Sequence, residues 1–196
     1  MINRNKVRIG ITLGDPSGIG PEITAKSVAR GIKGAVCVVI GDGFVFDAAC
    51  RGKRVLTPDF EFIDLKNVKH TGFSFGRVSA GSGKASIEYL DYAMRMLASG
   101  DIDCLVTCPI SKEAVNLAGF HYSGHTEYLA LKTGRPDVVM MLVNDVFKFS
   151  LVTRHIPLAK VSRALTAKKI VNTLKVTHGA LRGLFGIARP RIAVLG

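Results

Sequence analysis

The sequence lacks several features that mark particular classes of protein. It has no tryptophan, no Cys-x-x-Cys pair among its four cysteines, and no apolar run long enough to cross a membrane. The N-terminus shows no signal-peptide pattern. With 196 residues, of which 47% are apolar and 21% charged, the chain is neither a disordered protein nor a disulfide-stapled mini-protein. We therefore expect a cytoplasmic, globular protein with reduced, buried thiols and no membrane partner.

Acidic residues are missing from the last quarter of the chain. Residues 1–145 carry 17 Lys or Arg and all 15 acids, whereas residues 146–196 carry 10 basic residues and no acid, so the net charge is +12. A charge of this sign raises nucleic acid as a partner. The basic residues are spread thinly, however, and lack the interleaved aromatic side chains on which bases stack. We expect an unbalanced surface and no nucleic-acid binding.

Short β-rich runs alternate with helical patterns, which predicts an α/β fold with a mostly parallel sheet. Apolar residues recur at intervals of three and four from Lys84 to Ala98 and from Thr166 to Phe185, so both stretches are predicted helices. Shorter helices are expected after Pro21, Gly43, Ser111 and Thr126. The expected domains are residues 1–122 and 123–196. The predicted strands are Val7–Thr12, Ala35–Ile40, Glu61–Leu65, Cys104–Thr107, Val138–Val143, Phe147–Thr153 and Arg191–Leu195.

Two segments with possible binding chemistry follow predicted strands in the first half. The glycine-rich loop Gly14–Glu22 opens a helix, so it either faces an anionic ligand or forms a purely structural turn. The segment Thr107–Lys112 places Lys112 where it either meets a phosphate or carboxylate or is simply a solvated lysine. For Lys112 we favour the solvated lysine.

Two further segments contain histidine. His125 and Thr126 stand at a glycine-punctuated helix entrance, where Thr126 is either a site residue or a helix cap. His155 follows a predicted strand and precedes Pro157, a suitable position for a neutral nitrogen ligand of a divalent metal. One histidine does not make a site, and His178 falls on the apolar stripe of its helix, where we expect a hydrogen-bonded core residue.

Together these segments, in this order and at these separations, resemble the 4-hydroxythreonine-4-phosphate dehydrogenase family of vitamin B6 (pyridoxal phosphate) biosynthesis. The resemblance rests on residues 11–22, Gly83–Ser86, Thr107–Glu113, Gly124–Glu127 and Thr153–Leu158, and it spans the whole chain. It implies a two-domain fold similar to that of isocitrate and isopropylmalate dehydrogenases. It also implies a homodimer with the active site near the subunit interface.

The resemblance further implies an NAD-dependent oxidation of 4-(phosphooxy)-L-threonine, a small phosphorylated hydroxy acid, with decarboxylation to 3-amino-2-oxopropyl phosphate. A divalent metal (zinc, magnesium or cobalt) would assist both steps. His125 and Thr126 match family positions that contact the substrate, and His155 matches one of three histidine ligands of the metal. No catalytic residue is assigned. Cys108 stands where relatives have a small residue.

Members of this family are longer than this chain, and we expect its C-terminal part to be missing. The resemblance places the other two metal histidines and most of the NAD pocket in that part, so we expect the 196-residue chain to be inactive alone. Three alternatives remain: a dehydrogenase of 4-phospho-D-threonate or 4-phospho-D-erythronate, a non-catalytic binding module, and a basic nucleic-acid binder.

Overall fold

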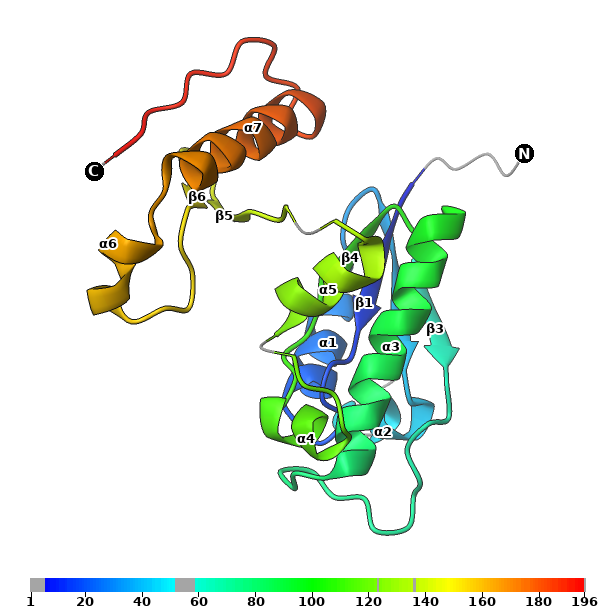
Figure 1. Cartoon of the computed structure of the whole chain (residues 1–196). Helices are drawn as coiled ribbons and strands as arrows, with labels where there is room; N and C mark the ends of the chain where they lie inside the picture. The colour runs from blue at the N-terminus through cyan, green and yellow to red at the C-terminus, as the bar shows by residue number, and fades with distance from the viewer. Residues whose placement is uncertain (1–5, 52–58, 123, 136, 196) are drawn as a thin grey trace. The chain divides into compact units, whose positions relative to one another are not determined.

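The computed structural model of the chain describes residues 6–51, 59–122, 124–135 and 137–195 (Figure 1). The chain forms two compact units, Met1–His125 and Thr126–Gly196, which we call the first and second unit and describe separately. The division falls after His125, whereas the sequence patterns placed it before residue 123. No helix in the described ranges combines the length and hydropathy that a membrane crossing requires.

The first unit contains a four-stranded parallel sheet in the order β3-β2-β1-β4. Its strands are β1 (Val7–Thr12), β2 (Ala35–Gly41), β3 (Phe60–Asp64) and β4 (Cys104–Thr107). β1 pairs with β2 on one side and with β4 on the other, so the strand order reverses at β1. The expected α/β fold with a parallel sheet is confirmed, and loops that follow the strands meet at one edge.

Three helices connect these strands: α1 (Gly20–Val28), α2 (Gly43–Ala49) and α3 (Ala80–Ser99); α4 (Lys112–Leu117) follows β4. Right-handed crossovers place α1 and α2 on one face of the sheet and α3 on the other. α3 crosses β1, β2 and β4 and packs on α4, as Figure 1 shows in green. Its start lies before the predicted Lys84 because the Ser79 side chain accepts a hydrogen bond from the Ser82 N–H and caps the helix.

The core of the first unit lies on both faces of β2. Val38, Val39 and Ile40 are fully buried, as is Tyr89 of α3, whose hydroxyl donates a hydrogen bond to the carboxylate of Asp42. The other oxygen of Asp42 accepts the Val68 N–H at 2.9 Å. A buried carboxylate at the end of β2 therefore holds both a core helix and the loop that follows β3.

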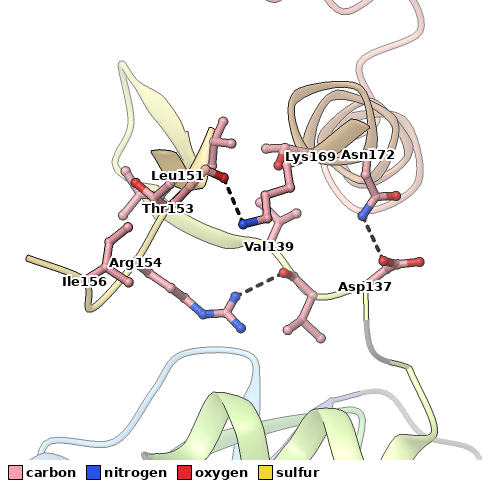
Figure 2. A pocket seen from close by; sticks show the side chains of 12 residues that line it. Asp137, Val139, Leu151, Thr153, Arg154, Ile156, Lys169 and Asn172 are labelled. Atoms are coloured by element: carbon pink, nitrogen blue, oxygen red, sulfur yellow. Dashed lines mark hydrogen bonds between the residues drawn. The ribbon is translucent and has the colours of Figure 1, made fainter. Parts of the chain in front are cut away.

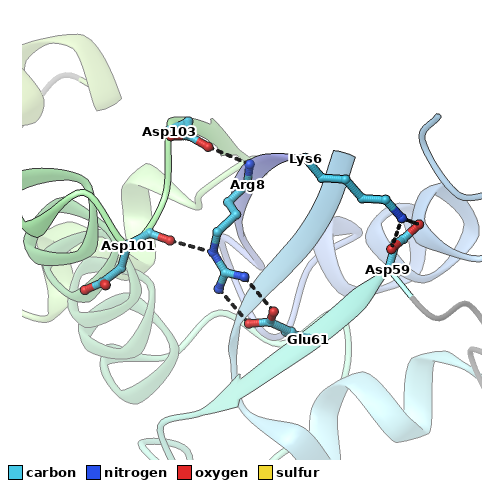
Figure 3. A network of polar contacts seen from close by, with 6 residues as sticks. All are labelled: Lys6, Arg8, Asp59, Glu61, Asp101 and Asp103. Carbon is cyan, nitrogen blue, oxygen red and sulfur yellow. Dashed lines mark hydrogen bonds and ion pairs between the residues drawn. The ribbon is translucent and has the colours of Figure 1, made fainter. Parts of the chain in front are cut away.

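A polar network ties the strands at the opposite end of the sheet (Figure 3). The Arg8 guanidinium donates two hydrogen bonds to Glu61, at 2.6 and 2.7 Å, across the intervening strand β2. Arg8 Nε also donates to the Asp101 carbonyl, and the Asp103 carboxylate accepts the Arg8 N–H. The hydrogen bond from Arg8 lowers the pKa of Glu61 and raises that of Arg8 in return. The network fixes the register of β1, β3 and β4.

The second unit is built on a two-stranded antiparallel sheet, β5 (Met140–Val143) and β6 (Lys148–Leu151). α7 (Ala167–Gly183) packs on β6, and its Thr177 hydroxyl donates to Ser150 Oγ at 2.8 Å. The Thr166 side chain caps α7. The remaining elements are α5 (His125–Thr133), which starts at the last residue of the first unit, the 3-10 helix η1 (Leu158–Lys160), and α6 (Val161–Ala164).

Three expectations from the sequence are wrong. Arg191–Leu195 is not a strand, because no neighbouring strand in the described ranges supplies the hydrogen bonds of a ladder. His178 is exposed rather than buried, since the buried positions of α7 are Thr177 and Leu181, and His178 is rotated about 100° from Thr177 around the helix. Cys104 is exposed, whereas Cys37 and Cys108 are buried; all four thiols are free.

Candidate functional site

Gly14 and Gly20 of the Gly14–Glu22 loop are required because other backbone atoms pack closely against them. Gly14 has φ +68°, and a Cβ there would lie 2.3 Å from the Pro109 carbonyl oxygen. A Cβ on Gly20 would lie 1.9 Å from the Leu13 carbonyl oxygen. The Asp15 N–H also donates to Pro109 O at 2.9 Å, so this loop is locked against the loop that follows β4. The structure thus supports the structural turn for Gly14 and Gly20.

Asp15 and Ser17 shape the same loop. Asp15 Oδ1 accepts the Ser17 N–H at 2.9 Å, and burial raises the pKa of Asp15 although this hydrogen bond opposes the rise. The Ser17 hydroxyl shares a hydrogen bond of 2.8 Å with the Ser82 hydroxyl at the start of α3. Ser17 therefore faces the first turn of α3 and links the loops that follow β1 and β3.

Lys112 and Cys108 lie on the loop and helix that follow β4. Lys112 is exposed in the first turn of α4, and Ser111 caps that helix by accepting the Ala114 N–H, as its sequence position predicts. The Cys108 thiol is buried against Thr24, with Sγ and Oγ1 3.1 Å apart, and burial raises its pKa. Lys112 is thus placed as a solvated lysine and Cys108 as a packing residue.

His125 is the first residue of α5, with its side chain half-buried. Its Nε2 atom is fully buried and has no hydrogen-bond partner in the described ranges. Burial lowers the pKa of His125, which favours the neutral ring. Thr126 is the second helical residue rather than the residue before the helix, so the helix-cap interpretation of Thr126 is wrong. A buried polar atom without a partner is unfavourable unless a ligand supplies one.

His155 lies in the turn after β6, which ends at Leu151, two residues before the predicted end. Its side chain is exposed, and its backbone has φ +53°, a left-handed conformation that non-glycine residues rarely adopt. Such strain often marks functional positions. The imidazole of His155 is exposed to solvent.

A pocket of about 330 Å³ lies beside this turn, within the second unit (Figure 2). Arg154 donates from Nη1 to the Val138 carbonyl at 3.1 Å, and its Nε lies 3.5 Å from Glu127 Oε1. Across the pocket, Asn172 donates to Asp137 at 2.9 Å and Lys169 donates to the Ala164 carbonyl, also at 2.9 Å. Sequence reasoning missed Arg154, Lys169, Asp137 and Asn172, and only the position of Arg154 beside His155 offered a signal.

The described ranges contain no group of three or more His, Cys, Asp or Glu side chains placed to hold a metal ion. His121 and His125 stand four residues apart, but the helix begins at His125, so the two rings do not share a helical face. His155 is thus a single candidate ligand, and one imidazole does not hold a cation.

Comparisons with known proteins identify relatives along nearly the whole chain. The family model for the pyridoxal phosphate biosynthetic protein PdxA matches residues 35–196. The 4-hydroxythreonine-4-phosphate dehydrogenase of Desulforapulum autotrophicum is 37% identical over 98% of this chain and 62% of its own length. That of Aromatoleum aromaticum is 38% identical over 96% and 60%, respectively.

The chain belongs to the PdxA family.

Solved structures of the PdxA family agree with this assignment. The crystal structure of the 4-hydroxythreonine-4-phosphate dehydrogenase from Klebsiella pneumoniae matches with a TM-score of 0.85 at 31% identity, over 96% of this chain and 62% of that one. The predicted resemblance is therefore confirmed. The chain spans about three fifths of the length of the curated PdxA relatives that it matches.

Proposed function

We propose that the chain contributes to a PdxA-type dehydrogenase that oxidises 4-(phosphooxy)-L-threonine with NAD and a divalent metal. Hydride would pass from the secondary alcohol to NAD, and the resulting 3-oxo acid would lose carbon dioxide to give 3-amino-2-oxopropyl phosphate. Family membership supports the reaction, and the relatives, which are 4-hydroxythreonine-4-phosphate dehydrogenases, suggest its substrate. The homodimer and the arrangement of domains known from isocitrate dehydrogenase belong to the same proposal.

The observation that carries the role of this chain is the buried, unpartnered Nε2 of His125. A neutral imidazole offers one N–H donor and one acceptor nitrogen. Because burial lowers the pKa of His125, the ring stays neutral at pH 7 and can hydrogen-bond a polar substrate group without bringing a charge. Thr126, the next residue in the first turn of α5, would add its hydroxyl to the same substrate.

The residues that the structure describes do not complete the metal site or the NAD site. His155 would be one of several metal ligands, and the described residues add no others in its group. The Gly14 and Gly20 backbones are already in contact with other backbone atoms, so these two glycines leave no space for a diphosphate against the backbone. We therefore assign no catalytic step to a metal in this chain alone and propose that the 196-residue chain does not turn over substrate.

Titration of the chain with 4-(phosphooxy)-L-threonine, followed by NMR of the histidine ring protons, tests the role of His125. We expect a saturable shift of the His125 signals. The variant His125→Gln should bind at least about tenfold more weakly, because a hydrogen bond in a buried site is lost. The matched control is His121→Gln, since His121 is exposed four residues earlier.

Equal binding by His125→Gln and wild type would remove His125 from the substrate site. A second measurement follows NADH formation by the chain with substrate and zinc, magnesium or cobalt. Turnover would contradict the proposed incompleteness of the cofactor sites. Parallel titrations with 4-phospho-D-threonate and 4-phospho-D-erythronate distinguish the related substrates, in which a hydroxyl replaces the amino group.

A further inference from the structure

A second pocket lies in the first unit, at the edge of the sheet where the strands end. Its volume is about 410 Å³. Ser17 lines it from the loop after β1. Lys69, Arg77 and several neighbours line it from the loop after β3, and Gly81, Ser82 and Lys84 from the first turns of α3. In doubly wound sheets, ligands bind at this edge, beside the point where the strand order reverses. Its lining does not include His125, Thr126 or His155.

The charges of this pocket have one sign. Lys69, Arg77 and Lys84 line it, and no Asp or Glu is among its lining residues. Lys84 has one acidic neighbour, Glu88 one turn along α3, at 3.7 Å in an exposed pair. The structure records no ion pair for the side chains of Lys69 or Arg77 in the described ranges. The cations therefore face the pocket without a compensating carboxylate in its wall.

Hydroxyl groups complete the wall. The Ser82 hydroxyl lies 2.8 Å from that of Ser17 and 2.9 Å from that of Ser79, and both Ser17 and Ser82 are buried. The loop opposite is held in place, because Asp42 accepts the Val68 N–H and Gly76 donates its N–H to the Ser17 carbonyl at 2.7 Å. The wall is thus preorganised by hydrogen bonds that do not use the cations.

From the three cations, the hydroxyl wall and the lack of a lining carboxylate, we infer that this pocket binds a phosphate group. Guanidinium and ammonium donors around a concave site suit the charge and the acceptor oxygens of phosphate. Two ligands of the proposed reaction carry such a group: the phosphate monoester of the substrate and the diphosphate of NAD. No comparison assigns Lys69, Arg77 or Lys84 to either ligand. The inference goes beyond the proposed function and does not depend on turnover.

Calorimetric titration of the full chain with inorganic phosphate and with pyrophosphate tests this inference directly. We expect saturable binding. The double variant Lys69→Gln/Arg77→Gln should weaken it by about tenfold or more, because charge-assisted hydrogen bonds are removed. The matched control Arg30→Gln/Lys33→Gln removes two exposed cations outside the pocket and should change affinity less than about twofold, since exposed charges at a distance are screened.

Gly81 offers a test that does not weaken the fold. It lies in the first turn of α3, and outside the helix backbone Ser79 Oγ, at 3.8 Å, is the one atom of the described residues within 4 Å of a Cβ placed there. Gly81→Glu places a carboxylate in the lining of the pocket and should abolish phosphate binding, while a negative charge at a helix N-terminus is favourable for stability. Gly81→Ala should bind as wild type does. A melting temperature at or above that of wild type confirms that Gly81→Glu is folded.

Binding of phosphate by folded Gly81→Glu with wild-type affinity would overturn the inference, as would the absence of saturable binding to the wild-type chain. Competition then identifies the source of the phosphate. Displacement of bound pyrophosphate by NAD assigns the pocket to the dinucleotide, and displacement by 4-(phosphooxy)-L-threonine assigns it to the substrate. Because inorganic phosphate needs neither NAD nor turnover, failure of the proposed dehydrogenase reaction would leave this result unaffected.

Discussion

The two units differ in how much apolar surface each buries. In the first unit, β2 is buried along almost its whole length and contributes to a core that includes α1, α2 and α3. In the described part of the second unit, the buried apolar side chains are Tyr128 and Leu181. Large apolar side chains are exposed on both strands of its sheet, including Leu142, Phe149 and Leu151.

This difference follows from the architecture. A sheet is stable when both faces are covered or when one face is polar. α7 covers the face of β5 and β6 that carries Ser150, while Leu142 and its cross-strand partner Phe149 lie on the other face and are half-exposed. The first unit therefore has the contacts of an independently stable domain, and the second unit derives much less stability from its own apolar burial.

Two leucine-to-alanine variants give the largest expected contrast between the units. Leu90 of α3 is 1% exposed, so Leu90→Ala should lower the free energy of unfolding by about 3 kcal/mol through lost burial and a cavity. Leu142 of β5 is 56% exposed, and Leu142→Ala should cost less than about 1 kcal/mol. Urea unfolding followed by circular dichroism measures both. Equal losses would show that the apolar face of β5 is covered in solution.

Two helical glycines should respond with opposite signs. A Cβ on Gly83 of α3 would lie 1.9 Å from the Ala114 carbonyl oxygen, so Gly83→Ala should destabilise the first unit by about 2 kcal/mol or more. Beyond the backbone of α7 itself, no atom of the described residues lies within 4 Å of a Cβ placed on Gly179, and Gly179→Ala should stabilise the second unit by about 0.5–1 kcal/mol. Thermal unfolding of both variants tests the signs. A loss at Gly179 would reveal a close neighbour of α7 in solution.

The contrast also explains which parts of the fold were predictable from sequence. β1 and β4 were predicted with their observed bounds because alternating or continuous apolar residues are flanked by turn residues there. In the second unit, the apolar pattern of Arg191–Leu195 predicts a strand, but this segment is not one. An apolar pattern does not by itself supply a partner strand in the described ranges to form hydrogen bonds. A local sequence pattern predicts a strand or helix correctly only where the rest of the unit provides the packing partners that the element needs.

The candidate site shows the same limit. The motifs identified His125 and His155, but the buried Nε2 of His125 and the left-handed backbone of His155 depend on tertiary structure. The pocket that we propose to bind phosphate was not predicted, because Lys69 and Arg77 belong to an irregular loop with no recognisable motif. The hydrogen bonds of Ser17 reveal it: its carbonyl accepts the Gly76 N–H of this loop, and its hydroxyl pairs with Ser82 at the start of α3.

Buried hydroxyl groups provide a smaller contrast between the units. Tyr89→Phe removes the hydrogen bond to the fully buried Asp42 and should lower the free energy of unfolding by about 2 kcal/mol. Thr177→Val removes a bond to the half-buried Ser150 and should lower it by about 1 kcal/mol or less.

Burial and the bond to Asp42 raise the pKa of Tyr89 above its ordinary value of 10.0. The contribution of this hydroxyl is therefore complete below pH 10.0 and is lost at higher pH, where the unfolded chain ionises first.

Urea unfolding at neutral and alkaline pH measures this effect. The difference in free energy of unfolding between wild type and Tyr89→Phe should shrink as the pH rises above about 10. A constant difference across that range would mean that Tyr89 is not held by Asp42. Thr177→Val, which removes no titrating group, is the control for general alkaline destabilisation.

The smallest effect is expected at His125, where the first unit ends. Burial lowers its pKa below the ordinary value of 6.5, so in acid the unfolded chain takes up a proton before the folded chain does. The contribution of the neutral ring to stability is thus complete above pH 6.5 and is lost as the pH falls through and below that value.

His125→Gln should lose less stability than wild type between pH 7 and pH 5, as measured by thermal unfolding in matched buffers. His178→Gln is the matched control, because it also removes one histidine but leaves the buried ring of His125 in place. If His125→Gln followed the wild-type curve as well, the ring would be solvated in solution, and its unpartnered nitrogen would no longer distinguish it from an ordinary surface histidine.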